Sequence, residues 1–149
     1  MIKVGERTIR FLVAGILVAV VLSFATVMDG FCAGKDLWKA PPPAPYKMVS
    51  SLVQLPEFIP GLGTLYVDPA TLPAGPFLAY GKNKKLVSTI YMIPLKNIND
   101  HKDFKDLKVA HRKVDHVDML FNAGHPGVPE PHYHIILWYI SAKAAEALK

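Results

Sequence analysis

The segment His132–Ile140, HYHIILWYI, is the strongest indication of the fold of this chain. If it is extended, its side chains alternate between two faces, and both faces are then largely apolar. This pattern predicts a central strand that is packed on both sides. Trp138 is expected in the core, because large aromatic side chains dominate core burial.

More strands are predicted upstream of this stretch. Val114–Phe121, VDHVDMLF, is the second strong candidate. Shorter apolar runs predict strands at Thr64–Val67, Phe77–Tyr80 and Leu86–Pro94. The last two flank Gly81–Lys85, where glycine and asparagine can supply the positive φ of a hairpin loop.

Two short helices complete the prediction. One covers Asn99–Lys108, with Phe104 and Leu107 as its buried positions. The other covers Ala142–Leu148 and follows Ser141, a suitable N-cap. Together these elements predict an α+β domain built on an antiparallel β-sheet, open or barrel-like, with two short helices.

This single α+β domain is expected to cover residues 56–149. Residues 35–55 are interpreted as a proline-rich spacer and a mixed segment, because Pro41–Pro45 (PPPAP) favours a stiff, extended chain. A total of 149 residues with 51% hydrophobic content excludes both a multidomain enzyme and a disordered chain.

Residues 1–34 are interpreted as a signal peptide or an N-terminal membrane anchor. A basic start with Lys3, Arg7 and Arg10 is followed by the uncharged run Phe11–Met28. This order of basic and apolar residues is typical of a secretory signal, and the run is also just long enough to cross a bilayer. Both alternatives predict an exported protein, periplasmic or extracellular, and the second predicts attachment to the membrane.

The single cysteine excludes a disulfide framework. The formal net charge of +5 comes from scattered lysines, without an arginine-rich stripe or interleaved aromatic residues. Proteins that bind nucleic acid carry such stripes, so no nucleic-acid partner is expected.

Histidines carry the chemistry that the sequence suggests. Four of the six lie between Val114 and Trp138. His132 and His134 project from the same face of one strand, so two imidazoles can reach one metal ion without bending the backbone. His125 lies in the preceding loop, which can fold back toward them.

His116 and Asp118 share one face of the preceding strand. If Asp118 lies opposite His134, three or four nitrogen and oxygen donors converge, which suits zinc, copper or iron. A register shifted by one residue would turn His116 and Asp118 to the other face. In that case the histidines could be hydrogen-bonded structural residues.

Six short motifs resemble a family of exported bacterial domains without an assigned function. The resemblance covers Pro56–Ser141. The motifs are Ile59–Gly63 (IPGLG), Val67–Pro73 (VDPATLP), Tyr91–Ile93 (YMI), Val114–Asp118 (VDHVD), Gly124–Gly127 (GHPG) and Pro131–Tyr133 (PHY).

This sequence also departs from that family at several polar positions. Members carry a histidine after Pro-Gly-Met-Gly, a glutamate before Tyr-Met, and a Pro-His-Tyr-Asp-x-His strand. Leu65, Ile90, His134 and Ile136 stand at these positions here. The resemblance therefore implies the fold more than any activity.

A partial resemblance to the cupin barrel rests on Gly127, His132 and His134. The first cupin motif also has a glutamate three or four residues later, where this chain has apolar and aromatic residues. The resemblance thus implies a distant β-barrel relationship without the usual cupin metal site.

These observations predict an exported domain that binds or sequesters a transition metal through His132, His134 and His125, together with His116 or Asp118. One alternative is a metal-dependent enzyme with an open coordination position. A second is a cell-envelope interaction module with structural histidines. No residue is assigned a catalytic role, and whether the protein is an enzyme is left open.

Overall fold

The computed structural model describes residues 35–149. The predicted signal peptide or anchor over residues 1–34 lies outside them. In the described part of the chain, no helix combines the length and the apolar character needed to cross a bilayer.

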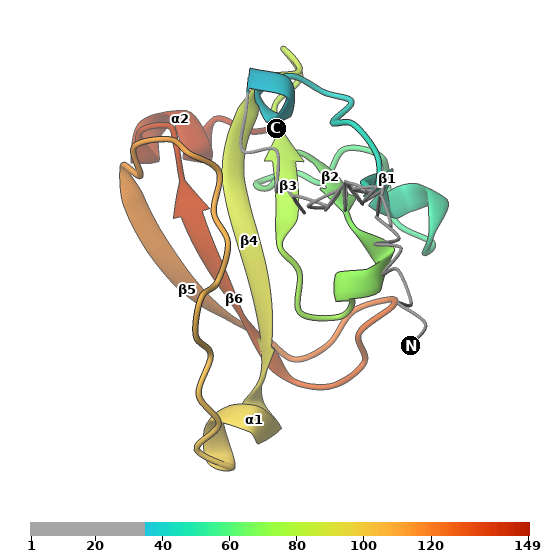
Figure 1. Ribbon diagram of the computed structural model, residues 1–149, viewed down its shortest axis with the longest axis vertical. Helices are drawn as coiled ribbons and strands as arrows, with labels where there is room; N and C mark the ends of the chain where they lie inside the picture. Colours follow the sequence, from blue (N-terminus) through green and yellow to red (C-terminus); the bar gives the residue numbers. More distant parts are fainter. Residues whose placement is uncertain (1–34) are drawn as a thin grey trace, which may run out of the picture.

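Six antiparallel strands form one open sheet, in the order β1-β2-β3-β4-β6-β5 (Figure 1). The strands are β1 (Lys47–Met48), β2 (Thr64–Val67), β3 (Phe77–Tyr80), β4 (Leu86–Pro94), β5 (His116–Asn122) and β6 (His132–Trp138). The short helices are α1 (Leu95–Asn99) and α2 (Ala142–Glu146), and three 3-10 turns are η1 (Lys35–Trp38), η2 (Val49–Ser51) and η3 (Pro69–Thr71). The predicted fold class is confirmed, and the sheet does not close into a barrel.

The central strands follow the predicted pattern closely. β2, β3 and β4 have the predicted bounds, and Trp138 is buried at the end of β6. The β3–β4 hairpin differs in one detail, because Lys84 has the positive φ, at 61°, rather than Gly81 or Asn83. Asn83 instead accepts a hydrogen bond from the Lys85 N–H through its side chain.

The helix predicted over Asn99–Lys108 is wrong. α1 ends where that helix was expected to begin, and the chain after it is irregular. His101 and Asp106 have φ values of 53° and 55°, which a right-handed helix cannot contain. Phe104 and Leu107 are consequently exposed, at 38% and 41%, rather than buried.

Residues 35–55 are packed on the sheet, where the sequence predicted a spacer. Leu37 is buried, and its carbonyl accepts a hydrogen bond of 2.8 Å from the Tyr80 hydroxyl. Lys39 forms a β-bridge with Lys85, and β1 pairs with β2. The segment thus contributes a strand and part of the core.

The sheet has two different faces. The histidine face carries His132, His134 and a core cluster that includes Phe77, Ile90 and Ile136. The tyrosine face carries a second cluster, with Tyr66, Leu78, Tyr80, Leu86 and Tyr139 among its buried members. The candidate site lies on the histidine face.

Candidate metal centre

Three histidines come together at one end of the histidine face. His132 is fully buried in β6, and His134 and His125 are half-buried. One ring nitrogen from each lies within 4.8 Å of the other two. The closest pair is His132 Nε2 and His134 Nε2, at 2.9 Å. The predicted convergence of these three residues is therefore present.

A tight turn in the β5–β6 loop places His125. The His125 and Val128 backbones exchange hydrogen bonds of 2.9 and 3.0 Å, and the Val128 side chain is buried in the core. Gly124 has a φ of 129°, and a Cβ atom there would lie 2.4 Å from the Pro129 carbonyl oxygen. Only glycine permits this close approach, which turns the loop back toward β6.

Backbone carbonyls fix the tautomers of two rings. His132 Nδ1 lies 2.7 Å from the Glu130 carbonyl oxygen, and His125 Nδ1 lies 3.0 Å from that of Pro126. A carbonyl oxygen only accepts, so each Nδ1 carries the proton and each neutral ring keeps a lone pair on Nε2. His134 then donates its Nε2–H to His132 Nε2.

The site favours the neutral form of the His134 ring. Burial, and to a smaller extent the neighbouring His132 and His125, together lower the pKa of His134 from 6.5 to about 4. A metal ion binds the neutral ring, so His134 offers little proton competition near pH 7.

His116 and Asp118 lie elsewhere on the same face. The strand register places Ile136 opposite Asp118, whereas His134 lies opposite Leu120. The expected face is therefore right, but the two residues are displaced along the sheet from the cluster.

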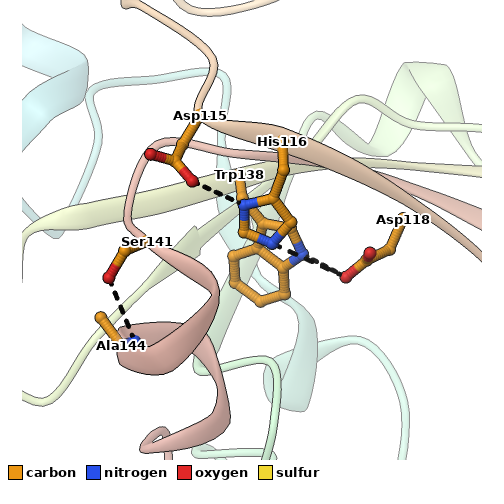
Figure 2. A network of polar contacts seen from close by, with 6 residues as sticks. All are labelled: Asp115, His116, Asp118, Trp138, Ser141 and Ala144. Carbon is orange, nitrogen blue, oxygen red and sulfur yellow. Dashed lines mark hydrogen bonds and ion pairs between the residues drawn. The ribbon is translucent and has the colours of Figure 1, made fainter.

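They belong instead to a network around Trp138 (Figure 2). The Trp138 indole donates a hydrogen bond of 2.8 Å to Asp118, and the His116 ring stacks on the indole. His116 also contacts the Asp115 carboxylate at 2.9 Å.

An apolar cavity of about 280 Å³ adjoins the histidines, and sequence reasoning missed it. His125, His134 and Asn122 contribute to its lining, and most of the other lining residues are aliphatic. Its walls come from segments far apart in the chain, including Val49–Leu55 and the β5–β6 loop. No local pattern indicates such an arrangement.

This fold is also present in a known protein. The solved structure of hypothetical protein TTHB210 from Thermus thermophilus superposes with a TM-score of 0.58 and 47% sequence identity. The match covers 63% of this chain and 92% of that one. This chain belongs to the same family as TTHB210. No family model and no curated protein matches the sequence.

Membership of the TTHB210 family confirms the predicted relationship to an uncharacterised family in its general form. TTHB210 is described as a hypothetical protein, so the family supports the fold and carries no activity over to this chain. The three histidines are therefore the feature of this chain that points to a function.

Proposed function

We propose that this protein binds a transition metal ion through His125, His132 and His134, as a binding or sequestration domain. One observation carries the proposal. The Nδ1–H groups of His132 and His125 are both held by backbone carbonyls, so the lone pair of each ring is on Nε2, and one ring nitrogen from each of the three histidines lies within 4.8 Å of the other two. Metal-bound histidines are typically oriented by such a second hydrogen bond.

The donor set favours zinc or copper. Three imidazoles with one remaining position make a common zinc arrangement, and imidazole also suits copper. Among residues 35–149 no carboxylate belongs to this histidine group, whereas non-haem iron sites usually include one.

Binding requires a small rearrangement of the rings. Nitrogen atoms around a tetrahedral zinc ion are about 3.4 Å apart, given Zn–N bonds of about 2.0–2.1 Å. The present separations extend to 4.8 Å. His134 must also break its hydrogen bond to His132 and either move its proton from Nε2 to Nδ1 or present Nδ1, so that all three rings offer a lone pair to the ion.

The test uses the full chain without a histidine tag. We expect near-stoichiometric zinc or copper by mass spectrometry after reconstitution, and a zinc affinity measurable by calorimetry. His132→Ala/His134→Ala should lose the metal. The matched control His111→Ala/His116→Ala removes two histidines outside the cluster and should retain it. Absence of metal from the wild-type protein would overturn the proposal.

A metal-dependent enzyme is the second candidate. Three protein ligands leave a coordination position where the ion can activate water or polarise a substrate. The cavity beside His125 and His134 favours this alternative, because it offers room for a second molecule at the site. Turnover that disappears in His132→Ala/His134→Ala would support it.

We also propose that the domain works outside the cytoplasm. The basic and apolar order of residues 1–34 supports export, with the segment cleaved or retained as an anchor. Fusion of a periplasmic reporter enzyme to the full chain tests this. Reporter activity that requires Phe11–Met28 is the expected result, and activity confined to the cytoplasm would contradict export.

A further inference from the structure

The apolar cavity lies under the histidine face, against the metal centre. Its walls include Val67 from β2, Phe77 from β3 and Met92 from β4, with Val53 and Leu62 from the segment between η2 and β2. Such a lining can hold only the apolar part of a ligand. Apolar pockets with a few converging polar groups are the usual form of small-molecule sites.

Gly127 allows the β5–β6 loop to close one side of the cavity. Its φ is 88°, and a Cβ atom at this position would lie 2.9 Å from Val53 Cγ1. The loop that carries His125 therefore packs directly against the segment that forms the opposite wall. The cavity and the metal centre are built by the same loop.

The polar groups of the cavity are concentrated at the histidines. His125 and His134 both contribute to its lining, and Asn122 lies beside them, held by a hydrogen bond of 2.8 Å from the Gly124 N–H. A ligand in the cavity would thus direct its polar end toward the ring nitrogens that hold the ion.

Among residues 35–149, no lysine, arginine, aspartate or glutamate lines the cavity. A carboxylate in this apolar surrounding would be strongly unfavourable without a positive partner. An ion held by the three histidines would supply a positive charge at this end, and an oxygen ligand would complete its fourth coordination position. Binding of an anionic head should therefore depend on the metal.

We propose that the cavity binds an aliphatic monocarboxylic acid whose carboxylate completes the coordination of the ion held by His125, His132 and His134. This inference rests on the metal-binding function proposed above. A volume of about 280 Å³ compares with about 30 Å³ for each water-sized molecule, so the cavity holds a ligand of about eight to ten non-hydrogen atoms. Octanoate has this size.

The experiment measures octanoate binding to the full chain by calorimetry, with and without zinc. We expect zinc-loaded protein to bind octanoate at least tenfold more tightly than metal-free protein. 1-Octanol has the same apolar chain without the carboxylate, so its affinity should change less than twofold with zinc.

A pair of tryptophan variants separates cavity binding from other binding. Leu65→Trp fills the cavity from β2 and should reduce octanoate affinity at least tenfold while zinc binding is retained. Leu137→Trp is the matched control, because Leu137 is a half-buried strand residue on the tyrosine face. Octanoate bound by the apolar run in residues 1–34 would remain in Leu65→Trp.

The outcomes distinguish the two proposals. Zinc binding without zinc-dependent octanoate binding overturns the ligand proposal and leaves the metal function in place. Octanoate binding that is unchanged in Leu65→Trp overturns it as well. If wild-type protein binds no zinc or copper, the metal function fails, and the carboxylate proposal fails with it.

Discussion

The two faces of the sheet use buried polar groups in opposite ways. On the tyrosine face, the Tyr80 hydroxyl donates to the Leu37 carbonyl and the Tyr91 hydroxyl donates to that of Lys108. These bonds hold irregular chain segments on the sheet. On the histidine face, His132 and His134 bond to each other and keep nitrogen atoms that can bind a ligand. The polar groups of the tyrosine face therefore stabilise the fold, whereas those of the histidine face form the proposed ligand site.

The largest expected effect comes from Tyr139→Phe on the tyrosine face. The Tyr139 hydroxyl accepts a hydrogen bond from the Ala110 N–H at 3.2 Å and bonds with the Thr89 hydroxyl at 2.7 Å, and all three residues are buried. Its removal leaves both partners unsatisfied, so the free energy of unfolding should fall by about 1–3 kcal/mol. Urea denaturation measures this loss, and zinc affinity should not change.

Tyr133→Phe is the matched control for this variant. Tyr133 lies in β6 on the same face, and within residues 35–149 its hydroxyl makes no hydrogen bond. Its substitution should change the free energy of unfolding by less than about 0.5 kcal/mol. A tenfold loss of zinc affinity in Tyr139→Phe would show that the two faces are coupled, and it would contradict the separate roles given to them.

The next effect is a loss of stability at acidic pH that arises from His134 on the histidine face. Burial is the main reason that the pKa of His134 falls from 6.5 to about 4. Between these pH values the unfolded chain binds a proton that the folded protein does not. The free energy of unfolding of metal-free protein should therefore decrease as the pH falls from 6.5 to 4, by about 1–2 kcal/mol after allowance for solvent screening.

Urea denaturation of metal-free protein at several pH values measures this decrease. His134→Gln removes the titrating ring, and the other histidines and carboxylates remain. The wild-type protein should lose more stability than the variant over this pH range. Equal slopes for the two proteins would mean that His134 titrates as it does in the unfolded chain.

The parts of the fold that depend on local pattern were predictable from sequence. Short apolar runs predicted the bounds of β2, β3 and β4, and the strand period of two places His132 and His134 on one face. His125 could be expected nearby because its loop connects directly to β6. These features require no knowledge of distant contacts.

The remaining features depend on contacts between distant segments. The packing of Leu37 under Tyr80 joins residues 43 positions apart, and the cavity requires Gly127 against Val53. The register that places Ile136 opposite Asp118 is set by how the β5–β6 loop turns. Periodicity identifies the face on which Asp118 lies, but it does not give the position of Asp118 along the partner strand.

Asp118→Ala should have the smallest effect. It tests whether the Trp138 network and the three-histidine group, which share the histidine face, act independently. The Asp118 carboxylate accepts the Trp138 indole N–H and lies 3.9 Å from His116 Nε2, but its side chain is 42% exposed. Its loss should therefore cost only about 1 kcal/mol in unfolding free energy. Zinc affinity should not change, because Asp118 is not part of the three-histidine group.

Asp115→Ala is the control for this variant, because the exposed Asp115 carboxylate contacts His116 and not the indole. It should alter stability less than Asp118→Ala and leave zinc affinity unchanged. A tenfold loss of zinc affinity in Asp118→Ala alone would show that this carboxylate contributes to metal binding. The set of metal ligands would then have to include Asp118 in addition to the three histidines. Unchanged affinity in both variants would confine ligand binding to the end of the face where His125 meets β6, and the Trp138 network would be purely structural.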